Sequence, residues 1–189
     1  MAAARPAAVA APEEAESARA RWVGWVAAAR FGDKAAFASL HAHFAGMVHA
    51  IVISRVSAAD AKDLVQDVFL VAMQRLSSLE DDAAFGGWLA QVARNRAAKH
   101  VRDAPQTAEL DDELPGHTPS DEAPDTRKVL KALRGLPEAY RETLAMRLIE
   151  GLSGPEIAER TGLTPGSVRV NLHRGMQQLK AALGLESEG

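Results

Sequence analysis

Two short groups of side chains have the chemistry needed to contact a nucleic acid. In the first, between positions 85 and 102, every charged residue is basic and no carboxylate occurs. Its members are Arg94, Arg96, Lys99 and Arg102, with His100 beside them. Lys and Arg neutralise phosphates, which supplies most of the free energy of non-specific nucleic-acid binding. The group therefore indicates a phosphate-contacting surface, and a solvated helix face is the alternative interpretation.

The second group follows a proline in the C-terminal part of the chain. Its polar members are Arg169, Asn171, His173 and Arg174. Arg can bind guanine O6 and N7 or a phosphate, Asn can bind adenine through two hydrogen bonds, and backbone amides at a helix N-terminus can hold a phosphate. The group indicates contact with DNA bases, and an ordinary helical hairpin with a solvated polar face is the alternative.

A set of carboxylates with helical spacing lies closer to the N-terminus. Asp60, Asp63 and Asp67 stand at positions i, i+3 and i+7, so they share one face of a helix and suit a basic partner surface. Gln66 can add a hydrogen bond to the same contact. A metal or acid–base set is the alternative, but no His shares this face in the sequence. We favour a partner-facing or solvated acidic stripe.

The remaining residues offer little catalytic chemistry. The chain has no Cys, which excludes disulfides, thiolate metal sites and a Cys nucleophile. His41 and His43 are two residues apart and would point to different sides of a helix, which makes a poor metal pair. No Gly-rich phosphate loop, nucleophile elbow or HExxH string occurs. We therefore expect no enzymatic activity, no cofactor and no metal.

The elements that would position these groups are helices. Only 5% of the residues are aromatic, and no regularly alternating apolar run indicates a strand. A short helix over residues 22–29 and three core helices are predicted in the N-terminal half, and a loop over residues 77–84 separates the last two. The apolar positions of the core helices are Phe37, Leu40, Phe44, Met47, Val48 and Ile51, then Leu64, Val68, Val71, Ala72 and Leu76, then Trp88, Leu89, Val92, Ala93 and Val101.

The C-terminal part begins with two predicted helices. A helix over residues 126–134 ends at Gly135, and Pro137 suits the first turn of the next helix. The apolar stripe of this next helix is formed by Leu144, Leu148 and Ile149, and Gly151 ends it.

The last two predicted helices form a helix-turn-helix. Ser153 and Glu156 have capping-box spacing before a short helix, and Gly162 provides the turn. Thr164 can cap the final helix, and Pro165 suits its first position. Ala158 is small where the helices must approach, and the shared core is Ile157, Leu163, Val168 and Leu172. The second helix would enter the major groove of DNA.

Charge and composition divide the chain into segments. Net charge is −3, but residues 103–126 carry eight carboxylates, four prolines and no Lys or Arg. Such a segment cannot bury enough apolar surface to fold, so it is predicted to be an acidic flexible linker. We expect a disordered tail (1–21), two all-α domains (22–102 and 127–183), the linker (103–126) and a C-terminal tail (184–189). The sequence shows neither a signal peptide nor a membrane span, which favours a soluble, cytoplasmic protein with no membrane partner.

The order of these motifs resembles a known family. The chain contains DLVQDVFL at residues 63–70, FGGWL at 85–89 and VARN at 92–95, and then the acidic linker, Leu136-Pro137 and the helix-turn-helix. In order and spacing this is similar to extracytoplasmic-function (ECF) sigma factors of the sigma-70 family. The resemblance covers nearly everything from Gly32 to Leu183. It implies a subunit that directs RNA polymerase to the promoters of a specific regulon, as in a stress response.

The resemblance also implies a role for each surface. Docking on the clamp helices of the largest subunit of core RNA polymerase is assigned to Asp60, Asp63, Gln66, Asp67 and Leu70. Binding and melting of the minus-ten promoter element is assigned to Ser77, Ser78, Trp88, Arg94, Asn95, Arg96, Lys99 and Arg102. Binding of the minus-thirty-five element is assigned to Ser167, Arg169, Val170, Asn171, His173 and Arg174. An anti-sigma factor is a further expected partner.

Two other functions are compatible with the residues. A stand-alone helix-turn-helix regulator would dimerise and bind an operator without polymerase. A sigma-like interaction protein would bind polymerase or a regulator without starting transcription, and the basic helix with Arg94 and Arg96 argues against it.

Overall fold

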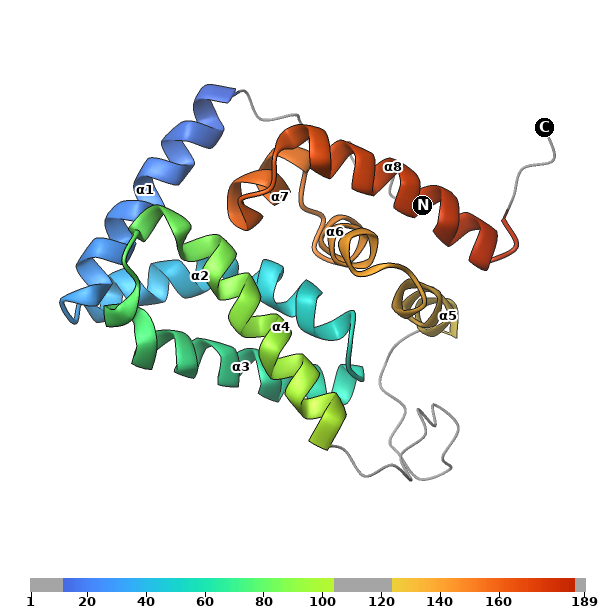
Figure 1. Cartoon of the computed structure of the whole chain (residues 1–189), viewed down its shortest axis with the longest axis horizontal. Helices are drawn as coiled ribbons and strands as arrows, with labels where there is room; N and C mark the ends of the chain where they lie inside the picture. The colour runs from blue at the N-terminus through green and yellow to red at the C-terminus, as the bar shows by residue number, and fades with distance from the viewer. Residues whose placement is uncertain (1–11, 104–123, 186–189) are drawn as a thin grey trace.

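The computed structural model describes residues 12–103 and 124–185, all of whose regular elements are helical (Figure 1). The N-terminal domain contains α1 (Pro12–Arg30), α2 (Lys34–Ile53), α3 (Ala58–Arg75) and α4 (Phe85–Asp103), with the 3-10 turns η1 (Leu76–Ser78) and η2 (Asp82–Ala84) between α3 and α4. The C-terminal domain contains α5 (Pro124–Arg134), α6 (Glu138–Leu148), α7 (Gly154–Thr161) and α8 (Pro165–Ala182). The expected all-helical, two-domain architecture is confirmed. The proposed flexible linker falls mostly on residues 104–123, outside the described residues.

Helix α2 is the centre of the N-terminal domain. Its N-cap is Asp33, whose carboxylate accepts hydrogen bonds from the backbone amides of Ala35 and Ala36. Phe44, fully buried on α2, makes edge-on ring contacts with Trp22 of α1 at 5.4 Å and Phe85 of α4 at 5.2 Å between centroids. Since α1, α3 and α4 all pack on α2, the helix is covered on several sides.

The apolar character of α2 also meets a length and composition test for a membrane-crossing helix. From the sequence no membrane span is expected, and the difference arises because three His and one Lys are spread among the apolar residues of α2. The packing of α1, α3, α4 and α6 around α2 explains its hydropathy as that of a core helix.

Predicted caps are found in the C-terminal domain. Ser153 and Glu156 form a capping box at the start of α7, Gly162 follows α7 with a left-handed φ of 75°, and Thr164 caps α8 by accepting from the Ser167 amide. The two helices of the helix-turn-helix therefore have the bounds that the caps predict. Gly175 lets α8 approach α6, because a Cβ there would lie 3.0 Å from side-chain atoms of Tyr140 and Leu144.

Some expected positions differ in the structure. Helix α1 begins at Pro12, ten residues before the predicted short helix, so part of the proposed N-terminal tail is helical. Leu148, Ile149 and Leu163 were expected in the core but are 45%, 38% and 39% exposed.

For Leu148 and Ile149 the reason lies in how α6 is enclosed. Helix α8 covers one face of α6 and α2 approaches another, so the buried residues of α6 are 142–146, and its C-terminal end emerges from the contact. Val101, near the C-terminal end of α4, is likewise 55% exposed.

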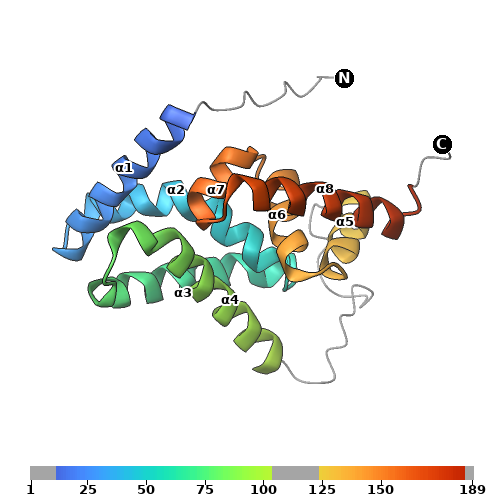
Figure 2. The same ribbon diagram turned by 45° about the horizontal axis from the view of Figure 1, so that its top comes forward.

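The two domains pack directly on each other. Helix α6 contacts α2, and α7 contacts α1, α2 and α4, so the buried apolar residues form one continuous cluster (Figures 1 and 2). No local pattern in the sequence indicates this contact. It brings the basic helix α4 against the domain that carries the helix-turn-helix.

Candidate nucleic-acid interface

Helix α8 presents most of its predicted base-contacting residues to solvent. Ser167, Arg169, Val170, His173 and Arg174 are exposed, and Asn171 is half-buried. Val168 and Leu179 on the same helix are buried, which fixes the rotation of the polar face outward. The hydroxyls of Ser167 and Thr164 lie 2.8 Å apart, so Ser167 is part of the helix cap.

The predicted minus-ten residues on α4 have different surroundings from one another. Asn95, Lys99 and Arg102 are exposed, and Asn95 accepts a hydrogen bond from Gln91 at 3.0 Å. Arg96 lies 3.9 Å from the Asp67 carboxylate of α3.

Trp88 and the loop residues complete the predicted minus-ten set. Trp88 packs on Phe85 with ring centroids 5.8 Å apart, as expected for a residue that belongs to the edge of the core. Ser77 and Ser78 are exposed in η1, and the Ser78 hydroxyl donates to the Arg75 carbonyl at 2.7 Å.

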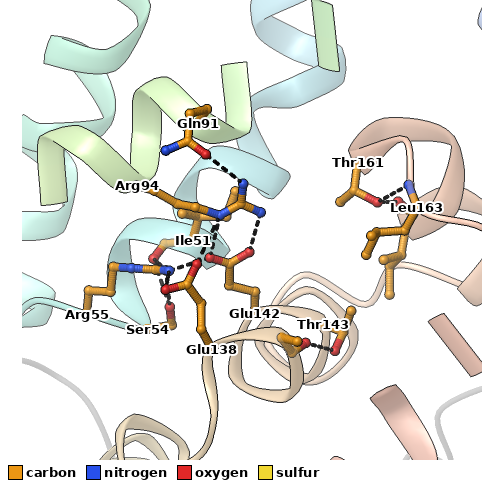
Figure 3. A network of polar contacts seen from close by, with 12 residues as sticks. Ile51, Ser54, Arg55, Gln91, Arg94, Glu138, Glu142, Thr143, Thr161 and Leu163 are labelled. Carbon is orange, nitrogen blue, oxygen red and sulfur yellow. Dashed lines mark hydrogen bonds and ion pairs between the residues drawn. The ribbon is translucent and has the colours of Figure 1, made fainter. Parts of the chain in front are cut away.

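Arg94 is the basic residue of α4 that the structure places most differently from expectation. Its guanidinium points into the domain contact and donates to Glu142 of α6, with Nε–Oε1 at 2.9 Å and Nη2–Oε2 at 2.7 Å (Figure 3). These hydrogen bonds raise the pKa of Arg94 above its ordinary value, although burial acts in the opposite direction. In this arrangement Arg94 is paired with protein rather than facing solvent.

Arg55 completes this cluster from α2's C-terminal side. It pairs with Glu142 and with Glu138, and it donates to the Ile51 carbonyl at 3.0 Å (Figure 3). Arg141 lies nearby, and its pKa is lowered by burial and then by the positive charge of Arg55. We call Arg55, Arg94, Glu138 and Glu142 the interdomain cluster.

The acidic face of α3 is partly engaged with α4. Asp60 accepts from the Ser57 hydroxyl at 2.6 Å, and His100 lies 3.4 Å from it. Asp63, Gln66, Asp67 and Leu70 are exposed, and Leu70 is 51% exposed. The predicted polymerase-docking residues therefore share one helix, but Asp60 is also hydrogen-bonded to Ser57, the N-cap of that helix. Within residues 12–103 and 124–185 no group of three or more metal-ligating side chains is found.

Glu142 is a residue of this cluster that no sequence pattern indicates. Only 5% of this residue is exposed, although Glu within a short helix with neighbouring charges is typical of a solvated face. Its role depends on contacts to residues 48 and 87 positions away, so no local pattern could have indicated it.

Comparisons with known proteins identify both domains. Residues 40–106 match the family described as Sigma-70 region 2, and residues 126–179 match Sigma-70, region 4. The chain is 33% identical over 165 residues to RNA polymerase sigma factor CarQ of Myxococcus xanthus, covering 82% of this chain and 93% of CarQ. It is 32% identical over 155 residues to ECF RNA polymerase sigma factor SigF of Caulobacter vibrioides, covering 78% of this chain and 86% of SigF.

Solved structures agree with these relationships. CnrH, determined in complex with the cytosolic domain of CnrY, has a TM-score of 0.58 and 26% identity, and the match covers 87% of this chain and 98% of CnrH. RpoE of Bartonella quintana, in complex with the anti-sigma factor NepR, matches with a TM-score of 0.51 and 23% identity over 79% of this chain and 98% of that one, which shows a shared fold.

The two family matches follow one another in the order of the two helical domains, and the relatives are aligned over most of their length. Core RNA polymerase and promoter DNA are the partners that this family implies. The chain belongs to the ECF group of sigma-70 family RNA polymerase sigma factors, non-enzymatic subunits that act in transcription initiation.

Proposed function

We propose that α8 reads the minus-thirty-five element of the promoter. The observation that carries this role is the outward face of α8, on which Arg169, His173 and Arg174 are exposed while Val168 is buried. An exposed polar face on the second helix of a helix-turn-helix suits the major groove. Ser167, Val170 and Asn171 complete the contact set, with Ser167 near the helix N-terminus where a phosphate can bind.

Helix α4 and the loop before it bind and open the minus-ten element. Arg96, Lys99 and Arg102 supply cations along the strand, and Arg94 joins them when it is free of Glu142. Exposed Ser77 and Ser78 border a loop suited to holding an unstacked base. Asn95 is exposed on the same helix, and Trp88 shapes its N-terminal end from the edge of the core.

Helix α3 docks on the clamp helices of the largest polymerase subunit. Asp63 and Asp67 offer negative charge and Leu70 offers an exposed apolar side chain on the same helix, a combination that suits a basic partner surface with an apolar centre. Gln66 adds a hydrogen-bonding group, and Asp60 contributes charge at the helix N-terminus.

Run-off transcription tests these roles together. Core RNA polymerase is supplied with a genomic fragment library from the encoding organism, with and without the chain. Discrete new transcripts that are lost in Arg169→Ala and Arg174→Ala, and kept in Gln177→Ala on the same helix, are expected. Tight DNA binding without polymerase and without new start sites would instead indicate a stand-alone helix-turn-helix regulator.

A protein regulator completes the proposal. The solved relative CnrH was determined with CnrY, and RpoE of Bartonella quintana with an anti-sigma factor. These complexes support an anti-sigma partner for this chain, acting in the cytoplasm where polymerase is found. Co-purification of the tagged chain from cells grown under varied stresses, followed by mass spectrometry, would identify the partner.

A further inference from the structure

The turn between α1 and α2 carries an aromatic side chain that projects from the fold. Phe31 is 94% exposed, the largest exposed fraction among the large apolar residues of the described ranges 12–103 and 124–185. Trp22, Phe44 and Phe85, in contrast, are buried in the core of the same domain. A single exposed apolar residue is ordinary on a protein surface, so the surroundings of Phe31 decide whether it has a role.

Backbone hydrogen bonds hold this turn in one conformation. The amides of Phe31 and Gly32 donate to the carbonyls of Ala28 and Ala29 at 3.1 and 2.9 Å. Gly32 has a φ of 91°, which favours glycine, and Asp33 then caps α2. Because the turn is already ordered, a partner that binds the ring there pays little for fixing the backbone.

The turn lies beside the loop that connects α3 and α4. Helix α1 contacts both η1 and η2, and Arg30, at the end of α1, donates to the Asp82 carboxylate of η2 at 2.7 Å. The turn and the loop meet at the same end of the N-terminal domain, on the left of Figures 1 and 2. This is the loop proposed above to hold an unstacked base, so Phe31 stands at the edge of that site.

The charge of the loop itself does not favour a DNA strand. Glu80 and Asp81 are exposed carboxylates, and Asp82 is paired with Arg30. Carboxylates repel the phosphates that cationic surfaces attract, so the loop cannot hold a strand by its own charge. Stacking of a base on an aromatic ring needs no charge and tolerates every base. An exposed ring beside the loop therefore supplies the attraction that the loop lacks.

Cations border the ring and the loop. Lys34 is exposed in the first turn of α2, three residues after Phe31. Arg75 is exposed where α3 ends and η1 begins. Sites for single-stranded nucleic acid combine cations that follow the backbone with rings that hold the bases. We therefore expect a base at Phe31 and phosphates at Lys34 and Arg75.

We propose that Phe31 is a stacking platform for an unpaired base of the DNA strand that the loop before α4 holds. This inference rests on the proposed minus-ten role of that loop. The base on Phe31 is a neighbour of the base in the loop, and any of the four bases is accepted because every base has a π-face. A protein surface is the competing occupant of the ring, and the tests below separate it from DNA.

Affinity for single-stranded DNA is the first test. The full chain is titrated into a fluorescein-labelled 20-nucleotide strand of mixed sequence, beginning at low salt, and binding is followed by anisotropy. Phe31→Ala and Phe31→Leu should bind about ten-fold more weakly than the parent, and Phe31→Trp should restore the parent affinity. Leu keeps the apolar bulk without the ring, so parent-like binding by Phe31→Leu would exclude stacking. A parent chain that binds no strand at low salt would also overturn the proposal.

A matched control removes another exposed apolar side chain. Leu185, beyond the C-terminal end of α8, is 61% exposed, and Leu185→Ala should keep the parent affinity. Phe31→Ala and Leu185→Ala should both keep the parent thermal midpoint, because exposed side chains contribute little to stability. Equal losses of affinity in the two variants would show an unspecific apolar effect.

The salt dependence separates stacking from phosphate contact. Phe31→Ala should leave the slope of log K against log salt unchanged, because the ring carries no charge. Lys34→Ala should make the slope shallower by about 0.7, the value for one lost phosphate contact on a single strand. A shallower slope in Phe31→Ala would mean that the substitution disturbs cationic contacts, which contradicts a stacking role.

Photocrosslinking identifies the occupant of the ring in the presence of polymerase. Phe31 is replaced by the photoreactive amino acid p-benzoylphenylalanine, and the chain is combined with core RNA polymerase and the same labelled strand. A crosslink to the strand is expected, whereas the same replacement at exposed Ala20 of α1 should give none. Crosslinks from position 31 to a polymerase subunit alone, or a weaker affinity of Phe31→Ala for core polymerase, would assign the ring to a protein contact and overturn the proposal.

Failure of this proposal is distinguishable from failure of the proposed minus-ten role. If Arg96→Ala and Lys99→Ala weaken strand binding and Phe31→Ala does not, only the stacking platform is wrong. If none of the three substitutions changes strand binding, the role of α4 and its loop is wrong as well.

Discussion

Arg94 of α4 and Glu142 of α6 form a two-pronged ion pair between the two domains, with N–O distances of 2.9 and 2.7 Å. Arg94 lies in the segment that matches sigma-70 region 2, and Glu142 lies in the segment that matches region 4. Parallel charge-assisted hydrogen bonds of this kind are stronger than neutral ones and require a defined orientation of both groups. The pair therefore couples the position of the basic helix to that of the helix-turn-helix domain.

A double-mutant cycle should measure this coupling. Combining Arg94→Ala with Glu142→Ala should change the free energy of unfolding non-additively, with a coupling of about 1–3 kcal/mol, because the two groups contact each other directly. The comparison pair is Arg102 and Asp103, which lie 3.5 Å apart with side chains 74% and 54% exposed. Its coupling should stay below about 1 kcal/mol. Urea unfolding followed by circular dichroism gives both values, and equal couplings would contradict the prediction.

Substitution of Gly175 should destabilise the C-terminal domain. A Cβ at this position would lie 3.0 Å from Tyr140 and Leu144, so α8 would have to move away from α6. Gly175→Ala should cost about 1–2 kcal/mol, since overpacking outweighs the gain in helix propensity.

Gly166→Ala on the same helix is the control, because a Cβ at this position would lie 3.9 Å from its nearest neighbour, the Thr164 hydroxyl oxygen. Thermal unfolding should show a lower midpoint for Gly175→Ala than for Gly166→Ala. The opposite order would show that α6 and α8 are less closely packed than described.

The capping box of α7 should contribute a pH-dependent stability. Burial alone would raise the pKa of Glu156, but hydrogen bonds from the Ser153 amide and hydroxyl and the charges of Arg160 and His43 outweigh it and lower the pKa below 4.5. Because the folded-state pKa is lowered, this stabilisation is present above the unfolded pKa and is lost as the pH falls through the folded value.

Glu156→Gln should therefore destabilise the chain most above about pH 5, and its difference from the parent should shrink toward pH 3. Ser153→Ala removes the cap, should cost about 1 kcal/mol near neutral pH, and should reduce the same pH dependence. Urea unfolding at pH 3 to 7 measures both effects. A constant difference across this range would exclude a contribution from Glu156 ionisation.

Leu70 should contribute to polymerase binding without contributing to stability. Its side chain is exposed on α3 beside the acidic residues. Leu70→Ala should weaken binding to core RNA polymerase about ten-fold, as for a central apolar contact in a protein interface, and should leave the thermal midpoint unchanged.

Lys62→Ala, at another exposed position of α3, serves as the control for Leu70. Fluorescence anisotropy of the labelled chain titrated with core polymerase gives the affinities. Similar affinity of Leu70→Ala and the parent would place the docking surface elsewhere on the chain.

Local chemistry along the sequence was sufficient to predict the helices and the helix-turn-helix. Ser153, Gly162 and Thr164 mark helix ends by side-chain caps and a left-handed turn, which depend only on neighbouring residues. The core positions Phe44 and Val68 follow from helical periodicity for the same reason. The motif order also indicated the sigma-factor family, which the matches to both regions confirm.

Contacts between distant segments were decided only by the tertiary structure. The residue type of Arg94 and its basic neighbours are typical of a solvated or DNA-facing position. Its pairing with Glu142 arises because two domains that are separate in the sequence pack together. Leu163 was assigned to the core by its type, yet 39% of it is exposed.

Each residue's chemistry and helical phase can be read from the sequence because they depend on local spacing. Its partner depends on which faces of separate helices meet, and that is set by the combined packing of the whole chain.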